Sequence, residues 1–264
     1  MKTILITLDS LNRNYLSLYQ NDGIKIRSLD ALANEGCVFE NHFTGSAPCM
    51  PARRELLTGT LELRHRSWGP LEPFDRSIPD RLKEVGCPSA LITDHYHLFE
   101  RGGENYHFPF TGYEFIRGHE NDNWKTHAVS PRTLHPLTHT TANQERNRSN
   151  IKRTEDYPSA QVFQAAGEWV SENQDTEQFF LYIDEFDPHE PFIVPDEYLA
   201  RVEQTPYEGP VLEWPKYGEW KGDELETTHL RNRYRAKLLF LDDLLIQFFD
   251  ALRKHGLWED TTII

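Results

Sequence analysis

Short apolar runs alternate with segments of helical periodicity along this chain of 264 residues. The clearest apolar runs cover residues 4–8, 89–93 and 179–186, and each has the length of a single strand. Strands that are covered on both faces of a parallel sheet read as nearly continuous apolar runs, as these do. We therefore predict strands at these three places, with shorter strands at residues 37–39 and 261–264.

Helical periodicity fills the stretches between these runs. Helices are predicted over residues 28–35, 78–85, 159–172 and about 224–255. Ser28 can cap the first of them, and glycines that can end a helix follow three of them, at positions 36, 86 and 256. A further helix is predicted over residues 52–57, with Pro51 in its first turn, where the missing N–H has no helical partner.

The alternation of strands and helices predicts one α/β domain over residues 1–264, with a doubly wound, mostly parallel sheet flanked by helices. Residues 100–156 fit this pattern poorly, because polar residues and glycines dominate there. We interpret this part as a long insertion over the active face. Such an insertion can contact substrate or a second subunit, so a homo-oligomer is an open alternative.

Composition narrows the classes of partner. The net charge of −14 argues against a nucleic-acid-binding protein, because a phosphate backbone requires a basic surface. No apolar stretch is long enough to span a bilayer, and the apolar N-terminal run is too short for a signal peptide. The three cysteines do not make a disulfide framework. From these features we expect no membrane partner and a cytoplasmic location.

The most informative motif is Cys49-Met50-Pro51-Ala52-Arg53, followed by Thr58-Gly59. This C-x-P-x-R-x4-T-G pattern resembles the signature of the type I sulfatases of the alkaline phosphatase superfamily, and the resemblance extends over essentially the whole chain. In that family the cysteine is oxidised after translation to formylglycine. The alternative interpretation is a buried structural cysteine ahead of a helix with proline in its first turn.

The resemblance implies a sulfuric ester hydrolase that acts on a small-molecule sulfate ester. Its cofactors would be formylglycine, made from Cys49 by a formylglycine-generating maturation enzyme, and a divalent metal, calcium first and manganese second. A geminal diol at position 49 would bind the metal, and metal coordination would lower the pKa of the diol. One of its hydroxyls would then attack sulfur. Arg53, one helical turn from Cys49, would stabilise the developing charge. Its alternative is a solvated position, which we expect for Arg54.

Further residues come from the ends of predicted strands. Asp9 is expected to bind the metal, because carboxylates at the carboxyl ends of parallel strands lie where such sheets bind ligands. The family has a second acid where this chain has Ser10, a weak ligand. The alternative for Asp9 is a structural role as a turn residue or a helix cap.

Three histidines complete the predicted site. His95-x-His97 stands where most sulfatases have Lys-x-His, so His97 is carried over as catalytic and His95 as substrate-binding. The pair could instead be a transition-metal site or have no role. His189, in a Pro-His-x-Pro segment, is expected to protonate the leaving group, because a departing alcohol needs a proton. Asp187 would orient His189 or cap the turn, and Asp242 and Asp243 are expected to be structural or solvated.

Alternatives to a working sulfatase remain at this stage. Sulfatases continue beyond the equivalent of the final strand into further metal ligands, so the resemblance implies that this chain carries only part of the metal shell. One alternative is a phosphonate or phosphate ester hydrolase, because relatives use the same nucleophile and metal. Another is a truncated, inactive homologue. Aromatic residues within 106–124 and 214–220 are candidates for lining the alcohol pocket or for the core.

Overall fold

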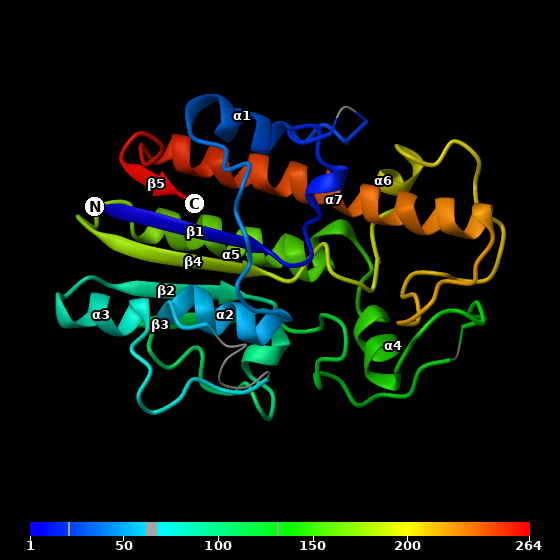
Figure 1. Cartoon of the computed structure of the whole chain (residues 1–264), viewed down its shortest axis with the longest axis horizontal. Helices are drawn as coiled ribbons and strands as arrows, with labels where there is room; N and C mark the ends of the chain where they lie inside the picture. The colour runs from blue at the N-terminus through cyan, green and yellow to red at the C-terminus, as the bar shows by residue number, and fades with distance from the viewer. Residues whose placement is uncertain (21, 62–67, 131) are drawn as a thin grey trace.

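A computed structural model describes residues 1–20, 22–61, 68–130 and 132–264. One sheet of five strands runs in the order β3-β2-β4-β1-β5, and its strand pairs are parallel (Figure 1). The strands are β1 (Lys2–Leu8), β2 (Ser89–Thr93), β3 (Gly112–Phe115), β4 (Phe179–Glu185) and β5 (Thr261–Ile263). The predicted fold class is confirmed, because the sheet is parallel and has helices on both faces.

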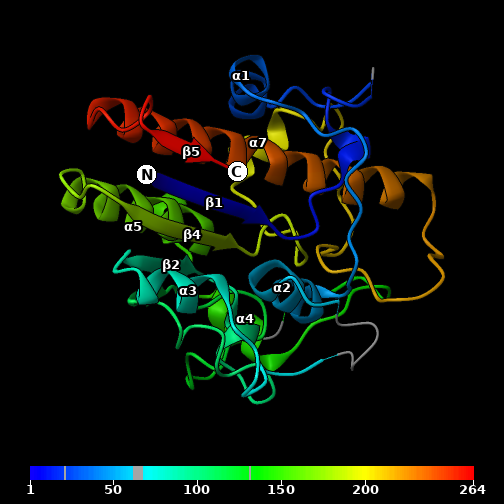
Figure 2. The same cartoon turned by 60° about the vertical axis from the view of Figure 1, so that its left-hand side comes forward.

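Alternate side chains of the inner strands supply two apolar cores. Ile4 and its neighbours Ile92 and Leu181 face one side, where they pack with residues of α5 (Pro158–Glu172) and α7 (Glu224–Lys254). Leu5 and Tyr182 face the other side, where they join residues of α2 (Cys49–Thr58). Figures 1 and 2 show α5 and α7 along one face of the sheet and α2 on the other. Both faces are therefore covered, which explains the continuous apolar runs.

The other helices are shorter. They are α1 (Arg27–Glu35), α3 (Ile78–Glu84), α4 (Ala142–Arg148), α6 (Asp196–Ala200), and the 3-10 turns η1 (Arg13–Tyr15), η3 (Tyr96–Leu98) and η4 (Thr154–Asp156). The predicted helices and the three main strands are all present, within a few residues of their predicted ends. Gly59 ends α2 in the left-handed conformation, with φ of 72°. Among the described residues, no helix is both long and apolar enough to cross a bilayer.

The N-terminus of α1 is capped from another helix. Ser28, predicted as the cap, lies inside α1, and its backbone N–H donates to Asp242 Oδ1 on α7 at 2.8 Å. Arg27 Nε donates to the other oxygen of Asp242 at 3.1 Å. A carboxylate at a helix N-terminus satisfies free N–H groups and complements the helix dipole. Asp242 is buried and structural, as expected, and the capping prediction for Ser28 is wrong.

Two further predictions are wrong, for residues 37–39 and for Arg54. Residues 37–39 form no strand and are exposed, because no neighbouring strand pairs with them. The segment 100–156, interpreted as an insertion, contains two elements that the sequence did not predict, α4 and the edge strand β3, whose largely exposed residues leave no apolar run to detect. Arg54 is fully buried rather than solvated, since its guanidinium donates twice to Asp75, at 2.8 Å each.

Candidate functional site

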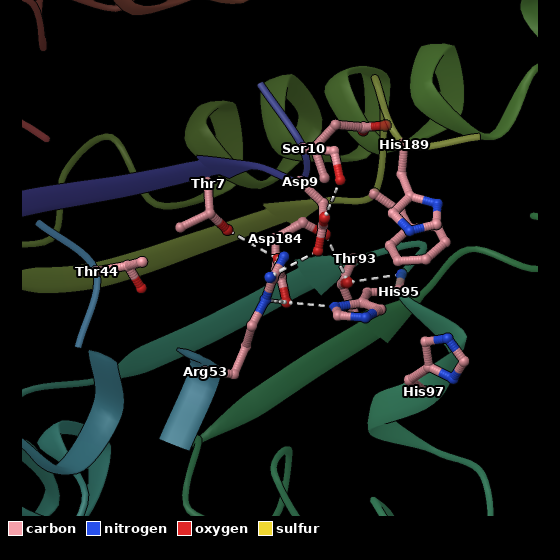
Figure 3. A network of polar contacts seen from close by, with 12 residues as sticks. Thr7, Asp9, Ser10, Thr44, Arg53, Thr93, His95, His97, Asp184 and His189 are labelled. Carbon is pink, nitrogen blue, oxygen red and sulfur yellow. Dashed lines mark hydrogen bonds and ion pairs between the residues drawn. The ribbon is translucent and has the colours of Figure 1, made fainter. Parts of the chain in front are cut away.

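Polar side chains gather at the carboxyl ends of three neighbouring strands (Figure 3). Asp9 follows β1, His95 follows β2, and Asp184 is the penultimate residue of β4. The register places Thr7, Asp184 and Thr93 side by side across the sheet. Parallel strands end at the same edge, so these groups, far apart in the sequence, share one site.

Helix α2 brings the cysteine motif to this edge. Cys49 is its first residue, and Arg53 lies one turn later on the same face. The Arg53 guanidinium points between the two carboxylates (Figure 3): Nη1 donates to Asp9 Oδ2 at 2.7 Å, and Nη2 donates to Asp184 Oδ1 at 2.6 Å. Arg53 is therefore a buried part of the site, and its alternative as a solvated residue is wrong.

The two carboxylates are held ionised by the charges around them. Burial opposes ionisation of both groups, but the charge of Arg53, with smaller contributions from His95 and hydrogen bonds, outweighs it, so the pKa values of Asp9 and Asp184 lie below the ordinary aspartate value. The hydroxyl of Thr7 donates to Asp184 Oδ1 at 2.8 Å, and the hydroxyl of Ser10 donates to Asp9 Oδ1 at 2.9 Å. These bonds fix both carboxylates.

Asp184 is the central residue that the sequence analysis did not single out. It is fully buried and binds Arg53, His95 and Thr7. The signal was available: Asp184, Glu185 and Asp187 place three carboxylates within four residues at the end of an apolar strand. Charged residues are rarely buried without a partner, so such a cluster indicates a site.

His95 is a neutral, fully buried imidazole. Burial, with Arg53 nearby, lowers its pKa to about 4. Its Nδ1 lies 3.1 Å from Asp184 Oδ2, and because an ionised carboxylate only accepts, Nδ1 carries the proton of this bond. Nε2 then presents a lone pair, and it has no hydrogen-bond partner among the described residues. His95 is thus oriented by Asp184 and has one ring nitrogen available.

Cys49 is close to a carboxylate and an imidazole. One ligand atom each of Cys49, Asp9 and His189 lie within 4.8 Å of one another. Burial, reinforced by the negative charge of Asp9, raises the pKa of the Cys49 thiol to about 12. An unmodified thiol would therefore stay protonated at neutral pH and would be a weak nucleophile. The interpretation of Cys49 as an inert structural residue does not account for this convergence of polar groups.

His189 is held by its own turn and by an aromatic ring. Its Nδ1 donates to the carbonyl oxygen of Glu190 at 2.7 Å, which leaves Nε2 for other contacts. Its ring stacks on Phe186, with ring centroids 4.6 Å apart, and His95 also stacks on Phe186, at 4.5 Å. Phe186 thus fixes the rings of two predicted site histidines. It was not identified from the sequence.

His97 lies further out than His95. Figure 3 shows its ring apart from the group around Arg53. Its Nδ1 binds Glu100, and its ring meets that of Trp68 edge-on at 4.9 Å. The structure therefore brings His95, rather than His97, together with Asp184. The catalytic role predicted for His97 stays a prediction.

A second buried polar cluster holds the turn that contains His189. The Lys237 ammonium of α7 binds Asp187 and donates to the backbone oxygen of His189 at 2.9 Å. Asp187 also accepts from His119 Nε2 at 2.8 Å and from Ser159 Oγ at 2.5 Å. Asp187 is tied to three side chains other than that of His189, so it anchors the turn and does not contact the imidazole ring in the way predicted.

The residues present fit a divalent cation as a partial shell. Asp9 offers a carboxylate oxygen, and the Cys49 sulfur stands where formylglycine would place oxygen. His189 lies beside them, but Nδ1 holds its hydrogen bond to Glu190, so Nε2 can serve either as a metal ligand or as a proton donor and not as both; as a ligand, an imidazole is more typical of transition metals than of calcium. Calcium takes about 6–8 oxygen ligands, more than these residues supply. Asp9 also shares its charge with Arg53.

The fold and the site define an α/β protein with an enzyme-like polar site at the carboxyl edge of a parallel sheet, and sequence comparison specifies the family. The chain belongs to the sulfatase family, whose sequence profile matches residues 2–264. The structure superposes on the phosphonate monoester hydrolase of Agrobacterium radiobacter with a TM-score of 0.73 and 19% identity, over 100% of this chain and 61% of that one.

Two curated relatives are similar over nearly the whole chain. PehA of Trinickia caryophylli, a multifunctional alkaline phosphatase superfamily protein, is 25% identical over 99% of this chain and 61% of its own length. An arylsulfatase of Hemicentrotus pulcherrimus is 21% identical over 98% of this chain and 45% of its own. The chain thus spans about half the length of these relatives.

Proposed function

We propose that this protein hydrolyses a sulfate monoester to an alcohol and sulfate, using formylglycine made from Cys49 and a divalent cation. The main observation in support is that one ligand atom each of Cys49, Asp9 and His189 lie within 4.8 Å of one another. They do so at the carboxyl edge of the sheet, where Arg53 lies buried between two aspartates. Maturation by a formylglycine-generating enzyme and a cytoplasmic location are parts of the same proposal.

Each residue has a defined task in this proposal. A hydrated formylglycine supplies an oxygen nucleophile and a second hydroxyl for release, and the cation would lower its pKa, with Asp9 and the group at position 49 as ligands. Arg53 stabilises negative charge that develops beside position 49. His95, with Nδ1–H held by Asp184, can accept a proton at Nε2. His189 protonates the departing alcohol oxygen from Nε2, in its protonated form.

The charge of the site favours monoanionic substrates. Asp9 and Asp184 are ionised, Arg53 is the cation between them, and His95 is neutral, which leaves one net negative charge before a metal binds. A divalent cation brings the sum for these four residues to one positive charge, which matches a sulfate monoester. The charge of protonated His189 is not part of this sum, because its proton passes to the departing alcohol oxygen. A dianionic phosphate monoester would be matched less well.

The second candidate substrate is a phosphonate monoester, which is also a monoanion. The departure from Lys-x-His to His95-x-His97 supports it, because the chain lacks the lysine that most sulfatases have at this position. The similarity to a phosphonate monoester hydrolase structure agrees with this candidate at the level of fold. Parallel rates on 4-nitrophenyl sulfate and 4-nitrophenyl phenylphosphonate would rank the two.

Mass spectrometry and kinetics test the proposal together. In protein from the native host, the peptide with Cys49 should be about 18 Da lighter than the unmodified peptide, since an aldehyde replaces the thiol. Cys49→Ala should abolish hydrolysis, and Cys37→Ala, at an exposed cysteine, should leave the rate unchanged. A native-host protein that retains the thiol at position 49, or a Cys49→Ala variant with full activity, would refute the proposal.

A further inference from the structure

A cavity of about 460 Å³ opens beside the reaction centre. Two of its lining residues, Ser10 and Glu190, directly follow Asp9 and His189 in the chain. The cavity therefore lies next to Asp9 and His189, the two residues that converge on Cys49. Because it lies beside the proposed reaction centre, this cavity is suitably placed to hold the alcohol half of an ester, the part that leaves when the bond to sulfur breaks.

Aromatic side chains form much of the wall. They come from four separate parts of the chain and comprise Tyr15, Phe192, Tyr217, Trp220 and Tyr234. Tyr234 meets Tyr15 edge-on at 4.8 Å between ring centroids, and Phe192 at 5.7 Å. Aromatic rings in such a wall offer faces and edges for stacking a flat ligand.

The wall is fixed to the turn that carries Asp9. The hydroxyl of Tyr234 donates to the backbone oxygen of Ser10 at 2.8 Å and accepts from the backbone N–H of Asn12 at 2.8 Å. Ser10 has a left-handed backbone, with φ of 62°, and its hydroxyl binds Asp9. A ligand packed on Tyr234 would thus be positioned relative to the proposed metal-binding carboxylate.

Most polar groups that line the cavity already have partners in the protein. Thr227 Oγ1 accepts from Trp220 Nε1 at 2.8 Å, and Lys216 Nζ donates to the Pro136 carbonyl at 2.7 Å. The side-chain oxygen of Asn12 caps η1. A sugar needs many hydrogen bonds to replace those it makes with water, and few free groups remain here to supply them. The aromatic faces remain available.

The charges near the cavity also exclude a cationic ligand. Lys216 and Arg231 line it against the single carboxylate of Glu190, and the Arg235 guanidinium lies 5.7 Å from the ring centroid of Tyr15. An aromatic wall can bind a quaternary ammonium group by cation–π contact, but these cations oppose it.

We propose that this cavity binds the alcohol half of the substrate and that this half is a flat aromatic alcohol, which makes the substrate an aryl ester. This inference rests on the proposed function for the reaction, and it commits to Tyr217 and Trp220 as residues that determine specificity. Both lie in the segment between Pro215 and α7, so they can be changed without touching Asp9, Cys49 or His189.

The test compares Tyr217→Ala and Trp220→Ala with Tyr113→Ala, a control on the edge strand β3. Binding of 2-naphthol is measured by calorimetry, which requires neither formylglycine nor metal. We expect each cavity variant to raise the Kd about fivefold to tenfold, as the loss of an aromatic contact should, and the control to leave it unchanged. With 2-naphthyl sulfate, kcat/KM should fall by the same factor, whereas methyl sulfate should be cleaved equally by all variants.

The outcomes separate the two proposals. If naphthol binds and the cavity variants weaken it, but no ester is cleaved, the aromatic cavity stands and the proposed hydrolysis fails. If esters are cleaved but naphthol binding and kcat/KM for 2-naphthyl sulfate are unchanged in both variants, hydrolysis stands and this inference is overturned. A preference for choline sulfate or N-acetylglucosamine 6-sulfate over 2-naphthyl sulfate would also overturn it.

Discussion

Replacing Lys237 by methionine removes the only side-chain ammonium that the described structure places on Asp187. Both side chains are almost completely buried, with 1% and 4% exposure. Methionine keeps the aliphatic length of lysine, so the change isolates the charge and its two hydrogen bonds. Asp187 would then keep its bonds from His119 and Ser159, and the backbone oxygen of His189 would lose its donor.

The magnitude follows from the burial of the pair. Breaking a buried ion pair on one side costs about 3–5 kcal/mol, because it leaves a charge without compensation. Asp187 retains two donors, so we expect a loss near the lower end, about 3 kcal/mol in the free energy of unfolding. The neighbouring carboxyl groups of Asp94 and Glu185 do not compensate the charge of Asp187. Burial raises the pKa of both and favours their neutral forms, so they do not add to the negative charge either.

The sign of the pH dependence should also change. In the wild type, burial acts to raise the pKa of Asp187, but Lys237 and His119 together outweigh burial and lower this pKa. Asp187 therefore adds stability above the unfolded-state pKa of aspartate, and this stability is lost as pH falls. Without Lys237, burial should raise that pKa. The folded state would then bind the proton more tightly than the unfolded state, and stability would fall as pH rises above about 4.

Urea unfolding at pH 5 and pH 8 measures the loss and the fall of stability with pH in the variant, and a third measurement at about pH 3.5 measures the opposite trend in the wild type. Lys254→Met, at an exposed position at the end of the same helix, is the control and should change stability by less than about 0.5 kcal/mol. The double variant Lys237→Met with Asp187→Asn should recover part of the loss, because the unpaired charge is gone. A loss below about 1 kcal/mol in Lys237→Met, or strictly additive effects in the double variant, would refute the reasoning.

Three further predictions concern single buried groups. In protein with an unmodified thiol at position 49, iodoacetamide at pH 8 should label the exposed Cys37 before Cys49. Asp9→Asn should speed the labelling of Cys49, because removing the carboxylate lowers the pKa of the thiol. Peptide mass spectrometry measures the labelling rate, and an unchanged rate in Asp9→Asn would contradict the prediction. Burial raises the pKa of Glu120 to about 8, so the folded state holds this proton more tightly and stability should fall from about pH 5 to 8; urea unfolding of Glu120→Gln should show a flatter profile, and an identical slope would contradict this. Arg54→Met should cost about 3–5 kcal/mol in chemical unfolding, because it removes one side of a buried bidentate ion pair with Asp75; a loss typical of a surface change would disprove the importance of that pair.

Local patterns in the sequence were sufficient for the main elements and for the motif. Apolar runs identified the strands at residues 4–8, 89–93 and 179–186. A strand that is buried on both faces is apolar at nearly every position, so it can be recognised without knowing which strands lie beside it. Glycine and proline positions identified the ends of the helices, since their backbone preferences act within a few residues. The spacing of Cys49 and Arg53 on one helical face followed in the same way.

Only the tertiary structure decided which groups meet. Asp184 reaches His95 through the register of β2 and β4, which pairs residues more than 80 positions apart, and it reaches Arg53 because α2 packs against the sheet. The burial of Arg54 and the edge strand β3 depend likewise on partners that no local pattern records. The aromatic wall joins segments from four parts of the chain. The sequence by itself determined the family signature and the elements, because these are local; the fold decided the site, because the distances and burial that set its charges are properties of the packed molecule.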